Sequence, residues 1–224
     1  MAKSKSQFIT IAAIAGLVAF VGDFLVTIVL GFFYPNYNHL KLVMSELGTP
    51  ASPVAVWVGL WWVVFGILFI AFAIGFAAAF ASGKKSALIV ALLIGLFGLG
   101  AGIGAGLFPI DSVGAEPTLS AGLHDVFAGL GFSAIAFVPL VSLAVFPRKH
   151  MPGMTWLSIG VFVLGLASFA LFIVSEDVPS TAGILSYIGL WQRLFLLTHY
   201  TYLGVIAALM IRSSRVLPEE NGHA

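Results

Sequence analysis

Long apolar runs separated by short polar segments form the pattern of this 224-residue chain. Each run has about 20 residues or more, the length with which an α-helix crosses the hydrocarbon core of a bilayer. We therefore expect an all-α polytopic membrane protein, a six-helix bundle that forms a single transmembrane domain over 1–224. The pattern predicts the six membrane-spanning helices over about 8–33, 54–81, 87–107, 120–145, 155–174 and 187–211.

The amino-acid composition supports this fold class. Hydrophobic residues make up 60% of the chain and charged residues 8%, whereas a soluble domain has about 25% charged residues. Cysteine is absent, which excludes disulfides, thiolate metal sites and a cysteine nucleophile. The sequence contains no nucleic-acid-binding motif or basic patch, so membrane lipids, and not nucleic acids, are the expected partners.

The basic residues are distributed unevenly between the two ends of the predicted helices. Eight of the ten Lys and Arg residues fall on the side that holds both termini, and only Lys41 and Arg193 fall on the other. Cytoplasmic loops of membrane proteins carry an excess of Lys and Arg. The pattern therefore predicts a plasma-membrane protein with cytoplasmic N- and C-termini. The eight residues are Lys3, Lys5, Lys84, Lys85, Arg148, Lys149, Arg212 and Arg215.

The third apolar run contains the glycine-rich sequence GLFGLGAGIGAG. Gly98, Gly102 and Gly106 are spaced four apart and share one helix face, with Gly100 and Gly104 beside them. Small residues at this spacing allow helix backbones to approach closely in lipid. A phosphate-binding glycine loop is the alternative, but it requires polar surroundings and a Lys, Ser or Thr. We favour close packing and expect this helix to be the central, buried one.

A polar break between the third and fourth apolar runs, Leu107–Asp125, concentrates titratable residues. It carries Asp111, Glu116, His124 and Asp125. A re-entering loop would bring the Asp111 carboxylate beside the His124 imidazole, and such a pair orients the ring as a base or as a metal ligand. Asp125 has an alternative role, because an acid in the first turns of a helix is favoured by the helix dipole.

Charged side chains within apolar runs are costly in lipid and are candidates for functional sites. Asp23 lies ten residues from the predicted end of the first helix, about 15 Å deep at the α-helical rise. His199 lies at a similar depth in the sixth helix. Nitrogen and carboxylate ligands suit a divalent metal such as zinc. The candidate metal ligands are Asp23, Asp111, His124 and His199.

The polar loop over 34–53 adds Glu46 to the same end of the bundle. Its alternative interpretation is an amphipathic interfacial segment, with Leu47 and the neighbouring apolar residues directed toward lipid. Arg193, near the start of the sixth helix, has two possible roles, because a long basic side chain either snorkels to the interface or pairs with an acid.

Acids outnumber Arg193 at this end of the bundle, so we expect it to pair with Asp23, Asp111 or Glu46. Such a pair would place its guanidinium among the polar groups of the site. The candidate catalytic residues are therefore Asp111, His124, Glu46 and Arg193.

Short motifs occur in a fixed order along the chain. They are Ser45-Glu46-Leu47-Gly48, Phe108-Pro109-x-Asp111, His124 at the start of the fourth helix, and Gly189-Leu190-Trp191-Gln192-Arg193. In this combination the chain resembles the bacterial and archaeal membrane family known as domain of unknown function 998. The resemblance covers nearly the whole chain and implies six membrane helices, but no activity or catalytic residues. Family members often have Glu at the position of Gln192, so a charged pair between this position and Arg193 is not expected here.

Four functions remain open. The first is a metal-assisted hydrolase acting on a lipid or lipid-linked substrate, although no compact ligand motif such as H-E-x-x-H occurs. The second is a small proton-coupled carrier in which Asp23 and His199 titrate; with only six helices, it would require a homo-oligomer. The others are a haem-binding electron carrier using His124 and His199, and a structural or regulatory protein without a catalytic site. The expected ligand at the outer face is a lipid or another small molecule.

Overall fold

The computed structural model describes residues 2–82, 84–112, 114–176, 178 and 183–216. Every regular element in this part of the chain is helical. The long helices are α1 (Ala2–Gly31), α2 (Ala55–Phe80), α3 (Lys85–Phe97), α5 (Leu119–Val145), α6 (Pro152–Val174) and α7 (Ile188–Arg215). The short elements are the 3-10 helices η1 (Met44–Gly48) and η3 (Gly183–Ser186), the π-helix η2 (Gly98–Gly104) and α4 (Ala105–Leu107).

Six helical segments are long and apolar enough to cross a membrane. The third of these spans, Lys85–Leu107, consists of three consecutive helical segments, α3, η2 and α4. The six predicted helices are therefore confirmed, with ends that differ by a few residues. α1 begins at Ala2 and α7 continues to Arg215, because helical hydrogen bonding extends into basic turns that the hydrophobic pattern leaves out.

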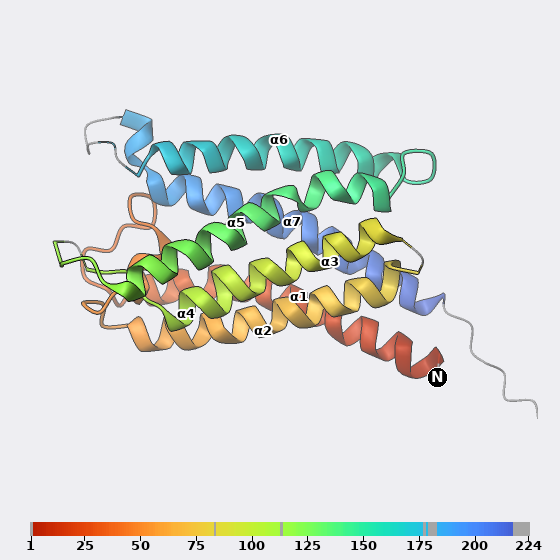
Figure 1. Cartoon of the computed structure of the whole chain (residues 1–224), viewed down its shortest axis with the longest axis horizontal. Helices are drawn as coiled ribbons and strands as arrows, with labels where there is room; N and C mark the ends of the chain where they lie inside the picture. The colour runs from red at the N-terminus through yellow and green to blue at the C-terminus, as the bar shows by residue number, and fades with distance from the viewer. Residues whose placement is uncertain (1, 83, 113, 177, 179–182, 217–224) are drawn as a thin grey trace, which may run out of the picture.

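The spans form a ring in which neighbours in sequence are also neighbours in space (Figure 1). α7 closes the ring by packing against α1 as well as α6. α7 is also the most enclosed span and α6 the most exposed, so the expectation that the third span is the central one is wrong. His199, Tyr200 and Tyr202 on α7 are buried. Lipid solvates their polar atoms poorly, and this favours the enclosed position of α7.

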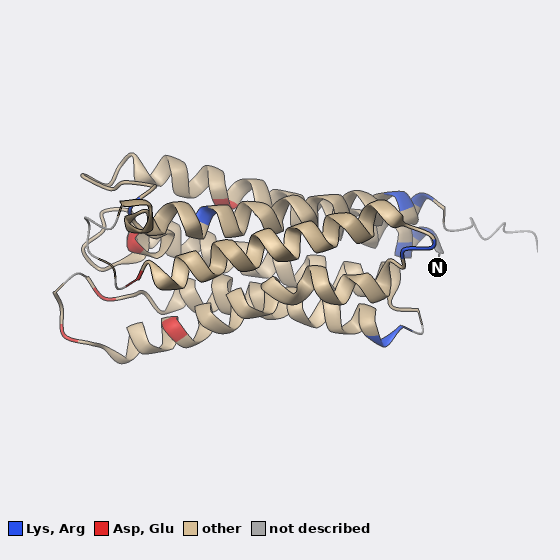
Figure 2. Cartoon of the chain, turned by 90° about the horizontal axis from the view of Figure 1, so that it is seen from above, with Lys and Arg blue, Asp and Glu red and all other residues tan. Residues whose placement is uncertain are grey.

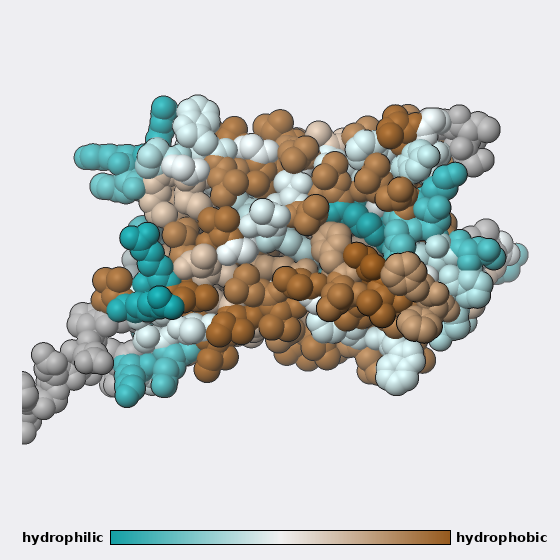
Figure 3. All heavy atoms as spheres, turned by 180° about the vertical axis from the view of Figure 1, so that it is seen from behind, coloured by the Kyte–Doolittle hydropathy of each residue, from teal (hydrophilic) through white to brown (hydrophobic). Residues whose placement is uncertain are grey.

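Apolar side chains cover the outside of the ring. Figure 3 shows a hydrophobic band between two hydrophilic ends. Ile11 on α1, Val56 on α2 and Val163 on α6 are among the exposed members of this surface. A continuous apolar surface of this kind is suited to lipid and not to water, and the chain is accordingly a multi-pass membrane protein.

The two ends of the ring differ in charge (Figure 2). Basic residues gather at the end that holds the N-terminus, as the sequence predicted. The described acidic residues lie toward the opposite end, where Lys41 and Arg193 also lie, and we call this the acidic end.

Glycine contacts hold the third span close to two of its neighbours. Gly98 and Gly102 face Gly66 on α2, and a Cβ on Gly98 would lie 2.8 Å from the Gly66 carbonyl oxygen. On the other side, a Cβ on Gly100 would lie 3.0 Å from the backbone nitrogen of Gly131 on α5. Helix backbones therefore approach closely along both faces, as the glycine spacing predicted. The π-helical winding of this segment was not apparent from the sequence.

Replacing Gly102 with alanine is expected to lower the free energy of unfolding by about 1–3 kcal/mol, because the new methyl group would overlap the backbone of Gly66. Gly160→Ala is the matched control, since Gly160 is exposed on α6 and has open space beside it. Unfolding of both variants in the same detergent measures the difference. Equal stability of the two variants would contradict the packing interpretation.

Candidate functional site

A cavity of about 650 Å³ lies inside the ring at the acidic end. All six spans contribute to its wall, and Val43, Met44 and Ser45 cover it as a roof. Ligand sites are typically cavities of this size in which a few polar groups converge within a largely apolar lining. The cavity is therefore the candidate functional site.

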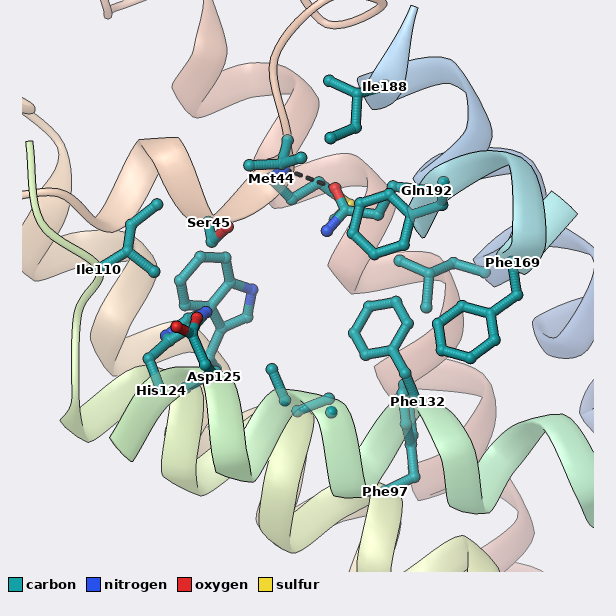
Figure 4. Close-up of a pocket in the computed structure, with 18 of the residues that line it drawn as sticks. Met44, Ser45, Phe97, Ile110, His124, Asp125, Phe132, Phe169, Ile188 and Gln192 are labelled. Atoms are coloured by element: carbon teal, nitrogen blue, oxygen red, sulfur yellow. Dashed lines mark hydrogen bonds between the residues drawn. The ribbon is translucent and has the colours of Figure 1, made fainter. Parts of the chain in front are cut away.

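Polar and aromatic side chains both contribute to the cavity wall. Ser45, His124 and Asp125 lie together on one side in Figure 4, and Phe132 and Phe169 lie on the other. The cavity thus offers hydrogen-bonding and charged groups as well as aromatic rings, which suits a ligand that is itself amphiphilic.

The exposed part of the cavity lining lies on α5 and at the end of α6. These helices lie close together near the basic end and diverge toward the acidic end (Figure 1). Among the described lining residues, those exposed at the surface all come from α5 or the end of α6, namely Asp125, Gly129, Ile173 and Glu176. Because Gly129 and Ile173 belong to apolar spans, the opening faces the level of the bilayer as well as the aqueous side.

Arg193, in the first turns of α7, holds the loop that forms the roof. Its Nη1 donates to the carbonyl oxygens of His39, Leu42 and Gly189, the last two at 3.0 Å. Its Nη2 donates to the Tyr37 hydroxyl at 2.8 Å. A guanidinium can satisfy several carbonyl oxygens at once because it carries five N–H groups. These oxygens take the place of the carboxylate partner that the sequence led us to expect.

Gln192 fixes the roof residue Met44 directly. Its Oε1 accepts a hydrogen bond from the Met44 backbone N–H at 2.6 Å (Figure 4). Beside it, the Leu190 N–H donates to the Leu40 carbonyl oxygen at 2.9 Å. The start of α7 and the loop after α1 therefore form one hydrogen-bonded unit, and Ser45 lies at its edge on the cavity.

η1 turns into the bundle and not toward lipid. Leu47 is 0% exposed and Met44 4%, so the alternative of an interfacial segment with Leu47 toward lipid is wrong. Glu46 is half-buried beside them, and burial raises the pKa of its carboxyl group. Burial, followed by the positive charge of Arg193, lowers the pKa of His39. Both shifts favour neutral side chains at the roof, where solvent is partly excluded.

His124 lies in the first turns of α5 and lines the cavity. Its Nδ1–H donates to the Phe108 carbonyl oxygen, 2.8 Å away. Asp111 instead accepts from the backbone N–H and the hydroxyl of Thr118, at 2.8 and 2.7 Å. The expected pair of His124 with Asp111 does not form, because the Asp111 carboxylate fixes the residue that caps α5.

Asp23 lines the cavity from α1 and is only 3% exposed. Its Oδ2 accepts from the Tyr200 hydroxyl on α7 at 2.8 Å, whereas its Oδ1 has no hydrogen-bond partner. The indoles of Trp61 and Trp62 lie near the carboxylate, yet the Trp61 Nε1 is also left without a hydrogen bond. Buried polar atoms nearly always have a partner, so Asp23 Oδ1 is a candidate contact for a ligand.

His199 does not line the cavity with Asp23. Its Nδ1–H donates to the Phe195 carbonyl oxygen at 2.8 Å, and its ring lies against Gly165 on α6. Within the described part of the chain, no three His, Cys, Asp or Glu side chains converge in a way that could hold a metal. The four candidate ligands lie apart, in separate local contacts: Asp23, Asp111, His124 and His199.

Two residues have roles in the site that the sequence did not reveal. The hydroxyl of Tyr200 donates a hydrogen bond to Asp23, whereas His199, the preceding residue on α7, does not contact it through a hydrogen bond. The run of polar residues from Thr198 to Tyr202, within an apolar span, is a signal of buried contacts but does not identify the partner. Gln192 belongs to a motif already noted, although its contact with the roof depends on the fold.

Comparison with known proteins gives a family but no characterised relative. The family model described as "Protein of unknown function (DUF998)" matches residues 13–209, and the chain belongs to this family. This confirms the resemblance carried by the four motifs. No curated protein and no solved structure matches the chain.

The Arg193→Lys variant is expected to loosen the roof, because one ammonium group cannot reach the oxygens that the guanidinium bonds. The chain has no cysteine, so a single Ser45→Cys substitution reports on the roof. We expect a maleimide to label this cysteine severalfold faster when Arg193→Lys is added. Arg212→Lys, at the opposite end of α7, is the control, and equal labelling rates in the two backgrounds would contradict the role of Arg193.

Proposed function

We propose that this member of the family binds an amphiphilic molecule, a lipid or a lipid-like small molecule, which enters the cavity sideways from the bilayer. The observation that carries the proposal is the position of the opening. Every described lining residue that is exposed lies on α5 or at the end of α6, and these helices belong to the lipid-facing ring. A ligand dissolved in the membrane therefore has a direct path to the cavity.

The mixed lining of the cavity supports an amphiphile. Phe132 and Phe169 provide apolar surface for a hydrocarbon part, and the same lining carries polar groups, including His124 and Ser45. About 650 Å³ accommodates a small amphiphile or part of a larger lipid. The loop that Arg193 holds covers part of this space at the acidic end.

Binding is favoured over metal-assisted hydrolysis by the distribution of the candidate ligands. Metal-assisted hydrolysis requires ligands that converge on one ion, and the described His, Asp and Glu side chains offer no such group. A carrier is the second candidate function, because a buried carboxylate with an unpartnered oxygen, Asp23, lies on the cavity wall. In a carrier, the ligand bound in this cavity would be the cargo.

We also propose that the acidic end faces the outside of the cell and that both termini are cytoplasmic, because eight of the ten basic residues belong to the opposite side. Glu116 and Lys149 are exposed at opposite ends of α5. A membrane-impermeant maleimide applied to intact cells is expected to label Glu116→Cys and to leave Lys149→Cys unlabelled. The reverse pattern would overturn the orientation.

Ligand entry is tested by a photoreactive probe, dodecyl glucoside with a diazirine in its chain, added to the protein in bilayer nanodiscs. We expect crosslinks to the cavity face of α5 and α6, at and around Phe132 and Phe169. Gly129→Trp should reduce them severalfold, because Gly129 lines the opening and has open space beside it. Gly160→Trp is the control on the outer face of α6. Crosslinks confined to outward-facing residues would argue against the proposed function.

A further inference from the structure

Three carboxyl groups contribute to the cavity wall. Asp23, Asp125 and Glu176 line the cavity, and no described lining residue is a Lys or Arg. The positive charge of Arg193 acts on Asp23 from outside the cavity lining, but its guanidinium is hydrogen-bonded to carbonyl oxygens of the roof and of α7. A group of acids alone does not identify a ligand, because solvent can stabilise exposed carboxylates such as Asp125. Asp23 differs from the others in its burial.

Asp23 lies on the back wall of the cavity, since α1 is across the ring from the α5–α6 opening. Thr27 bonds the Asp23 backbone oxygen, and Tyr200 bonds Oδ2. Neither contact reaches Oδ1, which is buried beside the indoles of Trp61 and Trp62 and makes no hydrogen bond of standard geometry. A proton on Oδ1 would not resolve this, because the proton would in turn need an acceptor. A buried carboxylate is stabilised by a positively charged partner.

Aromatic rings surround the same part of the cavity. Trp62, Phe65, Phe97 and Tyr200 line it together with Asp23. The ring centroids of Phe65 and Phe97 each lie 6.2 Å from that of Tyr200. Aromatic faces attract cations through the ring quadrupole, and aromatic cages bind quaternary ammonium groups in this way. A metal cation would instead need several oxygen ligands, which the described residues do not bring together.

We infer that the ligand carries a positively charged organic nitrogen, and that this ammonium group binds between Asp23 Oδ1 and the aromatic rings on the back wall. The apolar part of the ligand then extends along Phe132 and Phe169 toward the opening between α5 and α6. This inference rests on the proposed function and adds the charge of the ligand and the place of its head group.

The test uses two competitors of equal chain length against the neutral photoreactive probe described above. Dodecyltrimethylammonium is permanently charged, and dodecyl glucoside is neutral. With the unchanged protein, we expect the ammonium compound to suppress cavity crosslinking at a concentration about tenfold lower than the glucoside needs. Equal concentrations for the two competitors would overturn the inference.

Asp23→Asn is expected to remove the advantage of the ammonium competitor and to leave competition by the glucoside unchanged. The asparagine carbonyl still accepts from the Tyr200 hydroxyl, so the contact between α1 and α7 is kept. Asp125→Asn is the matched control, because it removes an exposed carboxylate from the same cavity. If Asp125→Asn caused the same loss, the negative charge would act diffusely and the Asp23 site would be wrong.

The two proposals fail in different ways. Absence of cavity crosslinks with the neutral probe would reject the proposed function whatever the charge of the competitor. Cavity crosslinks that both competitors suppress equally, or an ammonium advantage that persists in Asp23→Asn, would keep the cavity as a lipid-accessible binding site and reject the ammonium site at Asp23.

Discussion

Close contact between helix backbones along the third span shapes the whole bundle. At Gly104, this span meets Phe127 on α5 so closely that a side chain on the glycine would overlap the ring. α5 therefore leans toward the third span at the acidic end. Nearer the basic end α5 contacts α6, where Phe137 packs on Phe162 at 6.1 Å between centroids. Toward the acidic end, Phe132 on α5 and Phe169 and Phe172 on α6 lie between the two helices and line the cavity.

The roof brings together two motifs that are far apart in the sequence, Ser45–Gly48 and Gly189–Arg193. The loop before η1 turns its carbonyl oxygens toward the start of α7. A Cβ on Gly189 would overlap the carbonyl oxygens of His39 and Leu42. Carbonyl oxygens of an irregular loop need donors where water is scarce, and Arg193 supplies them. Its positive charge is thus used to complete the architecture around the cavity.

The pairing of Asp23 with Tyr200 has a structural consequence. The hydrogen bond joins α1 to α7 at the place where the ring closes, and polar contacts of this kind stabilise helix packing in membranes. That contact uses only Oδ2. Oδ1, which lies beside the indoles of Trp61 and Trp62 without a hydrogen bond of standard geometry, is the atom on which the proposed ammonium site rests.

The sequence by itself determined the six spans, the separation of charge and the close packing of the third span. These depend on run length, on counts of Lys and Arg, and on spacing along one helix, such as that of Gly98 and Gly102. Only the tertiary structure decided the partners of the polar residues, including Tyr200 in place of His199 for Asp23. Consecutive helical residues point about 100° apart, so each faces a different neighbour. In a bilayer the lipid-facing and buried sides are both apolar, so the hydrophobic pattern does not reveal how each helix is rotated.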